Sequence, residues 1–259
     1  AGTGDITARG ERNAVISSSG GSSTEGSRAL IASSNNAHIR GNQASRTILS
    51  SENIILEEPY TVAGGHQSIK WLLDSVRGNG TFAGAISSSL GGYGEYFESS
   101  TGQLIHTGTI VTLRGEKIVP ANVGDYMLGV ISETSAFISG ASSFVWQGRY
   151  LTNEFGGFIY ETVTDEESGE LIRVPKQNPD YDTALEANYH SRAARDEWHV
   201  VGLVGQHYVR IDETVNQGDY LTAHNGIGTK ATEGSWKVMK ITSAYTSEKG
   251  YGIALTVIK

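Results

Sequence analysis

The residues with the clearest chemical potential are two glutamates, Glu95 and Glu98, in the sequence SSSLGGYGEYFE at residues 87–98. Amide hydrolysis without serine, cysteine or metal needs an activated water and a proton donor for the leaving nitrogen. Two neighbouring carboxyls can supply both, because like charges a few ångströms apart raise the pKa of one of them. In a strand, Glu95 and Glu98 would lie on opposite faces. A second acid must then come from elsewhere, and on these residues alone an ordinary strand with surface glutamates is the commoner arrangement.

Other catalytic and binding motifs are missing from the sequence. The chain has no cysteine, which excludes disulfides, thiolate metal sites and a cysteine nucleophile. No P-loop, G-x-S-x-G or H-E-x-x-H pattern occurs. Glu186 and His190 have the i, i+4 spacing of a metal pair on a helix, but no third ligand is evident. We therefore expect a solvent-exposed pair there, no metal and no cofactor.

The composition limits the classes of partner. The 259 residues contain 28 Asp and Glu against 20 Lys and Arg, which gives a net charge of −8. Such a field repels phosphate backbones, so nucleic acid is not an expected partner. No apolar run reaches the roughly 18 residues of a membrane span, and residues 1–13 lack the apolar core of a signal peptide. The 33 glycines favour a β-rich protein.

The character of the sequence changes near residue 90, and we predict two domains, residues 1–90 and 91–259. The first is rich in Gly, Ser, Asn, Ala and Thr, and its short apolar triplets contain Ile16, Ile31 and Ile48. A fourth, similar frame surrounds Ile86. Each unit has too few apolar side chains to offset the ordering of about fifteen residues at roughly 1–2 kcal/mol each. The missing burial must come from neighbouring units.

Two arrangements of the repeats can supply this burial: units stacked along one chain, or equivalent chains intertwined around an axis. We favour intertwined chains, because residues 1–90 leave little room for a long solenoid. A disordered Ser/Gly linker is the alternative against which the regular isoleucines argue. The spacing in residues 67–77 allows a helix or a strand, and the flanking glycines favour a strand.

Residues 91–259 have the pattern of a compact β-barrel-like domain, so the predicted fold class is mainly β. The expected strands cover residues 105–114, 117–120, 125–131, 143–151, 200–204, 207–211, 236–242 and 251–258. A polar hairpin tip is predicted at residues 165–170. Only residues 183–198 have some helical composition.

One short pattern, N-x-G-D-Y followed by an apolar residue, occurs at residues 122–127 and again at 216–221. Glycine followed by aspartate is typical of a turn, and the tyrosine then opens a strand. The repetition indicates two related barrel-like halves, with a chance match as the other explanation.

Five segments occur in an order that resembles one known family. They are GGYGEYFE (91–98), NVGDYMLGVIS (122–132), YLTNEFG (150–156), the surroundings of DEW (196–198) and VNQGDYL (215–221). Over residues 91–259 they resemble the C-terminal autoproteolytic intramolecular-chaperone domain of Bacillus-type phage tail-spike and pre-neck appendage proteins, a glutamic-type peptidase. The preceding repeats resemble the β-structured shaft of such proteins.

The resemblance implies a homotrimer that holds its chains in register while the upstream spike domains fold, and that then cuts its own chain. It implies a cut ahead of Tyr93, in a region comprising Ser88, Ser89, Leu90, Gly91 and Gly92. Glu95 is the expected catalytic carboxylate. Its partners, in order of preference, are Asp125, Glu98, Glu133 and Glu154. The duplicated Asp219 favours a turn role for Asp125, and the family pattern carries an acid at the position of Gly92.

The alternative is a spike module that trimerises, or binds a host receptor, without cutting. Host glycan would then contact exposed tryptophans, although burial is the usual fate of aromatic side chains in β domains. The candidates are Trp71, Trp146, Trp198 and Trp236. In either case we expect a component of the virion tail that is assembled in the host cytoplasm.

Overall fold

The computed structural model describes residues 7–9, 13–16, 21–24, 27–40, 44–57, 60–76, 78–141, 148–166, 169 and 171–259. Its regular structure there is β-strand apart from two short 3-10 helices, η1 (Thr183–Asn188) and η2 (Arg192–Ala194). The chain divides into two compact units, one formed by Ala1–Ser87 with Arg149–Asp180 and the other by Ser88–Gly148 with Tyr181–Lys259. The prediction of a mainly β fold is confirmed. In the ranges given above, no helix is long and apolar enough to cross a membrane.

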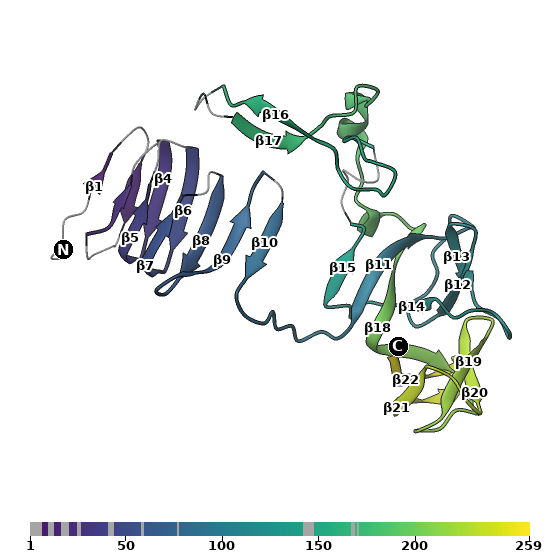
Figure 1. Ribbon diagram of the computed structural model, residues 1–259. Helices are drawn as coiled ribbons and strands as arrows, with labels where there is room; N and C mark the ends of the chain where they lie inside the picture. Colours follow the sequence, from purple (N-terminus) through teal and green to yellow (C-terminus); the bar gives the residue numbers. More distant parts are fainter. Residues whose placement is uncertain are drawn as a thin grey trace. The chain divides into compact units, whose positions relative to one another are not determined.

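The first unit contains a solenoid in which the chain alternates between two parallel sheets (Figure 1). One sheet has the order β1 (Thr7–Ala8), β3 (Ser23–Thr24), β5 (Asn35–Ile39), β7 (Glu52–Leu56). The parallel part of the other is β2 (Ala14–Ile16), β4 (Ser27–Ala32), β6 (Ala44–Leu49), β8 (Thr61–Gly65). Two antiparallel strands, β9 (Ile69–Asp74) and β10 (Asn79–Phe82), follow β8 and end the second sheet.

The solenoid core consists of apolar side chains that repeat from rung to rung. Ile31 pairs with Ile48, and Ile48 pairs with Ala63, in the second sheet. Ile39 pairs with Leu56 in the first sheet. All five side chains are fully buried and belong to one cluster, so the two sheets face each other across a shared core.

The serine and asparagine pairs of the sequence form the corners between the two sheets. Ser33 and Ser50 have positive φ angles of 51° and 46°, which turn the chain from one sheet into the other. The hydroxyl of Ser34 accepts a hydrogen bond from the backbone N–H of Ser51 at 3.2 Å, and Ser51 Oγ accepts one from Gly65 at 2.9 Å. Each buried corner hydroxyl thus joins one rung to the next, which explains why a solenoid has this polar composition.

The structure corrects three expectations about the repeats. A single chain stacks its own rungs, so the stacked arrangement is confirmed, and neither the favoured intertwined chains nor a disordered linker is needed to explain the repeats. Ile16 is 55% exposed, and Val15 pairs with Ile31 in its place. Ile86 is also 55% exposed and lies in a segment without strands. The strand predicted in residues 67–77 is confirmed as β9.

Matched substitutions test the solenoid core. Removing one methyl by Ile48→Val is expected to lower the free energy of unfolding by about 0.5–1.5 kcal/mol, since Ile48 is fully buried. Ile16→Val removes the same methyl from an exposed side chain and should change it by less than about 0.5 kcal/mol. Urea denaturation followed by circular dichroism measures both. Equal effects of the two variants would contradict this packing.

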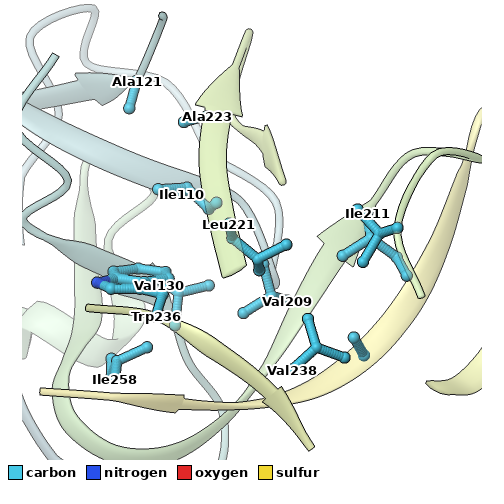
Figure 2. Packing of buried hydrophobic residues seen from close by; sticks show 12 residues of the cluster. Ile110, Ala121, Val130, Val209, Ile211, Leu221, Ala223, Trp236, Val238 and Ile258 are labelled. Carbon is cyan, nitrogen blue, oxygen red and sulfur yellow. The ribbon is translucent and has the colours of Figure 1, made fainter. Parts of the chain in front are cut away.

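The second unit is built around β18 (Trp198–Ile211), which belongs to two closed rings of strands. The first ring has the order β18, β20 (Ile227–Ala231), β19 (Tyr220–His224), β21 (Lys237–Thr246), β22 (Tyr251–Ile258), and β22 pairs again with β18. These five strands form a closed β-barrel. Its core contains Val209, Leu221, Trp236 and Ile258, which Figure 2 shows in one cluster.

The second ring uses the first half of β18. Its strands are β11 (Tyr93–Glu98), β18, β14 (Gly129–Ile131), β12 (Ile110–Arg114) and β13 (Lys117–Pro120). A parallel bridge between Ser99, just after β11, and Ile118 in β13 completes the circuit. Val111, Ile118 and Val201 are fully buried within one cluster here. The edge strand β15 (Phe137–Ser139) pairs with β11 from outside the ring.

Several predicted elements differ from those observed. The strands expected at residues 200–204 and 207–211 form one strand, β18. Residues 183–198 contain only η1 and η2, and Trp198 opens β18. The predicted hairpin has its two strands, β16 (Tyr160–Thr164) and β17 (Leu171–Pro175), which pair in antiparallel fashion, while residues 167, 168 and 170 of its tip lie outside the described residues. Most of the strand expected at residues 143–151 lies outside the described residues.

Candidate functional site

Glu95 lies in the middle of β11, between β15 and β18. It pairs with Ser139 on one side and with Val201 on the other. The hydroxyl of Tyr93 donates a hydrogen bond to Glu95 Oε1 and also lies 2.8 Å from Ser139 Oγ. Because side chains alternate along a strand, Tyr93 and Glu95 share one face of β11. Glu95 is half-buried, so it is held in position and still reaches water.

Glu98 and Asp125, the other two predicted acids, have their own basic partners. Lys117 Nζ lies 2.7 Å from Glu98 Oε1, and Arg114 Nη2 lies 2.6 Å from Asp125 Oδ1. Glu98 is on the opposite face of β11 from Glu95, as the spacing predicts. The three predicted acids therefore have three different sets of hydrogen-bond partners.

Asp125 closes a turn that the chain builds twice. Its Oδ2 accepts a hydrogen bond from the backbone N–H of Asn122 at 2.9 Å, and Asp219 accepts one from Asn216 at 2.8 Å. The glycine before each aspartate has a positive φ, 86° at Gly124 and 88° at Gly218. Asp219 is paired with Lys230 at 3.1 Å, as Asp125 is with Arg114. The duplicated sequence pattern therefore encodes one turn with a fixed carboxylate.

These turns predict a pH-dependent stability. The hydrogen bond from Arg114 lowers the pKa of Asp125, and the backbone hydrogen bond from Asn216 lowers the pKa of Asp219, both from an ordinary 3.8. A lowered folded-state pKa stabilises the protein above the unfolded-state pKa, and the stabilisation disappears as the pH falls through the folded value. As the pH is lowered below 3.8, we expect the urea concentration at the unfolding midpoint to decrease. The decrease should be less steep in the double variant Asp125→Asn/Asp219→Asn. Parallel curves for the two proteins would contradict this.

The remaining sequence candidates are dispersed. Glu133 Oε1 accepts a hydrogen bond from Thr107 Oγ1 at 2.6 Å, and Glu154 belongs to the other compact unit. Trp236 is a core residue, 2% exposed, which removes it as a glycan contact. The guanidinium of Arg192 lies over the ring of Trp198, 3.9 Å from the ring centroid. Trp146 lies outside the described residues.

No candidate metal site appears in the described part of the chain. Within those ranges, no three His, Cys, Asp or Glu side chains are grouped so as to hold a metal ion. His190, one half of the i, i+4 pair considered above, is exposed and follows η1 rather than lying on an α-helix.

The predicted cleavage region directly precedes β11. Residues 83–92 contain no strand, and residues 88–91 are exposed. The second compact unit begins at Ser88. A peptide bond here is open to water and lies within a few residues of Glu95.

Sequence reasoning missed His207, which lies in β18 and packs against Gly92, the last residue of this region. His207 is fully buried, and burial lowers the pKa of its imidazole. Its ring occupies the space in which Gly92 and Gly202 would carry a Cβ, at 2.3 Å and 2.5 Å from the nearest ring atoms. The only sequence signal for this packing is the glycines themselves, which are hard to distinguish from turn glycines in so glycine-rich a chain.

The comparisons with known proteins decide the family. The model of Peptidase_G2, the IMC autoproteolytic cleavage domain, matches residues 45–259. This chain belongs to that family. The resemblance inferred from the sequence is confirmed, and the Peptidase_G2 match extends upstream into the last rungs of the solenoid.

The relatives of this Peptidase_G2 chain are phage proteins. The pre-neck appendage protein of Bacillus phage phi29 is 47% identical over 202 residues, 77% of this chain and 23% of that protein. The pre-neck appendage protein of Bacillus phage B103 is 50% identical over 184 residues, 71% of this chain and 21% of that protein. The chain thus spans less than a quarter of the length of these curated relatives.

Solved structures agree with the fold. The crystal structure of the pre-mature bacteriophage phi29 gene product 12 matches all of this chain, and 34% of its own, with a TM-score of 0.88 and 40% identity. The C-terminal fragment of the same product matches 64% of this chain and 99% of its own, with a TM-score of 0.56 and 51% identity. The fold of the solenoid and the fold of the two-ring unit are therefore each similar to a known structure.

Proposed function

We propose that this chain is the C-terminal part of a phage tail appendage, and that it acts as a trimerisation chaperone that cuts its own chain once, within residues 88–92. The match of residues 45–259 to an autoproteolytic cleavage domain carries the proposal. The exposed, strand-free segment at residues 83–91 supports it, since a scissile peptide must be accessible to water. The non-cleaving alternative is not favoured by this family.

The chemistry follows from carboxylates alone. Water adds to the carbonyl carbon of the scissile peptide while a carboxylate accepts its proton. The C–N bond then breaks, and the leaving nitrogen takes a proton from a carboxylic acid. We assign the first of these roles to Glu95, which is fixed by Tyr93 yet not fully buried. Asp125 and Glu98 are the candidates for the second acid, from the same chain or from another copy.

Cleavage after assembly has a physical purpose in a long β-structured appendage. Chains with high contact order fold slowly and are exposed to misregister and aggregation. A trimeric clamp raises the effective concentration of the partner chains. Removing the clamp afterwards also removes the route back, so the appendage is kinetically trapped.

The partners follow from the same proposal. They are two further copies of this chain and the upstream domains of its own polypeptide. The names of the relatives, pre-neck appendage proteins, support a location in the virion. Assembly in the host cytoplasm is part of the proposal. Contact with host glycan would belong to other residues than Trp236, which is buried.

Intact mass spectrometry and light scattering on the purified chain test both parts of the proposal. We expect the full-length mass to be replaced with time by a fragment that begins within residues 88–92 and ends at Lys259, in particles of trimer mass. A chain that stays at full length under all conditions would contradict the proposed self-cleavage. A monomer mass before and after cleavage would contradict the proposed trimer.

A further inference from the structure

A chain of four hydrogen-bonding groups runs through the interior of the second unit toward the cleavage region. His207 Nε2 lies 3.1 Å from the carbonyl oxygen of Val204, so this nitrogen carries the proton. Nδ1 is then the acceptor, and Ser132 Oγ donates to it at 3.1 Å. Ser135 Oγ donates in turn to Ser132 Oγ at 3.3 Å. The imidazole is thereby fixed in one tautomer and one orientation.

The backbone of two glycines lies close against the ring of His207. A Cβ at Gly92 would lie 2.3 Å from Nε2, and a Cβ at Gly202 would lie 2.5 Å from Cε1. A Cβ at Gly205 would lie 2.5 Å from the Cα of Gly92. Gly92 and Gly205 also have positive φ angles, 80° and 112°. These three glycines, Gly92, Gly202 and Gly205, form a slot that has no room for larger residues.

One loop holds both His207 and the junction. Ser132 and Ser135 form the hydrogen-bond chain to the imidazole, while the next residue, Ala136, donates its backbone N–H to the carbonyl oxygen of Gly92 at 3.0 Å. Gly92 is therefore held at its carbonyl by the loop and at its Cα by the ring. The residues before it, 83–91, belong to no strand, so this loop and the ring hold the last residue of the cleavage region directly before β11 begins.

We propose that His207 is a positioning residue for self-cleavage, and that with Ser132 and Ser135 it fixes the peptide bonds just before Gly92 relative to Glu95. The inference rests on the proposed function. His207 acts through Gly92 and exchanges no proton with the substrate. Peptide hydrolysis is sensitive to such alignment, because a displacement of about 1 Å can cost about a hundredfold in rate.

The test compares two buried histidines of the same strand. His207→Gln retains a donor for Val204 but loses the rigid acceptor for Ser132, and we expect cleavage to slow by about tenfold or more. His199 is also buried, 4% exposed, and its imidazole contacts residues 103–105 rather than Gly92. His199→Gln is therefore the matched control, with an expected cleavage rate within about twofold of the wild type. First-order rates come from intact mass, and both variants are checked by thermal unfolding and light scattering.

A second measurement separates alignment from stability. Gly92→Ala places a methyl against the ring and should slow cleavage, and His207→Ala removes the ring that it meets. The clash with the ring exists only when both groups are present, whereas the contact with the Val204 carbonyl oxygen and the positive φ of Gly92 burden the methyl in either background. The double variant should therefore be less impaired than the product of the two single effects, though still slower than the wild type. If the rate effects of the two single variants simply multiply in the double variant, the contact between Gly92 and the ring of His207 does not affect cleavage.

The outcomes distinguish this inference from the proposed function. A wild type that never cuts removes the proposed function, and the inference with it. A wild type that cuts, together with a His207→Gln variant that cuts as fast as His199→Gln, removes the positioning role alone. Slow cutting by His207→Gln in a folded protein, at the same oligomeric mass as the control, supports it.

Discussion

Glu95→Gln is expected to leave the chain at full length under conditions in which the wild type cuts itself. Glutamine keeps an oxygen that can accept the hydrogen bond from Tyr93, so the local geometry of β11 is preserved. An amide, however, cannot take a proton from water at neutral pH. Because removing a general base or acid costs about 10²–10⁴-fold in rate, cleavage over hours should become undetectable by intact mass spectrometry.

The control for this variant is a glutamate in the same unit without a proposed role. Glu116 is exposed in the turn between β12 and β13, so Glu116→Gln should cut at the wild-type rate. Glu98→Gln and Asp125→Asn then test the second acid. A Glu95→Gln protein that yields the same fragment at the same rate would remove Glu95 from the reaction.

Trp236→Ala is expected to lower the free energy of unfolding of the second unit by about 3–5 kcal/mol, which is the largest stability effect we foresee. The indole is 2% exposed and belongs to the cluster that fills the closed barrel (Figure 2). Truncation to alanine leaves a cavity that the surrounding strands can fill only in part. Hydrogen exchange followed by mass spectrometry can measure this for each unit separately, which matters because a chain with two units need not unfold in one step.

Met239→Ala is the matched control, because Met239 lies close to Trp236 in sequence, in β21, and its side chain is 39% exposed. In the Met239→Ala variant, peptides of the second unit should be as well protected from hydrogen exchange as in the wild type. Peptides of the solenoid should be unaffected by either variant. Loss of protection in the solenoid alone after Trp236→Ala would contradict the division of the chain into these units.

The sequence predicts most clearly those elements that local chemistry determines. The hairpin of β12 and β13 follows from the Gly115-Glu116 turn between two apolar runs, and the repeated aspartate turn follows from its own residues. The stacking of the solenoid was harder to foresee. Counting only the triplets around Ile31 and Ile48, which lie in the second sheet, omits the first sheet, where Ile39 and Leu56 supply the burial that a single sheet lacks.

The candidate site, too, has features that the sequence predicts and features that it does not. The opposite faces of Glu95 and Glu98 follow from strand alternation alone. His207 could not be found, because its relation to Gly92 spans more than a hundred residues and depends on β11 and β18 being neighbours. Even β18 was misjudged as two strands. Gly205, which looks like a break, has a φ of 112° and continues the strand past the Cα of Gly92.

The sharing of β18 by two rings has a consequence for the product of the proposed cleavage. Every strand of both rings, from β11 onward, lies on the C-terminal side of residues 88–92. A cut there would break the strand-free connecting segment and would remove no hydrogen-bonded strand from either ring. The liberated portion should therefore keep its melting temperature. Since one continuous strand belongs to both rings, they should also melt cooperatively, as a single transition.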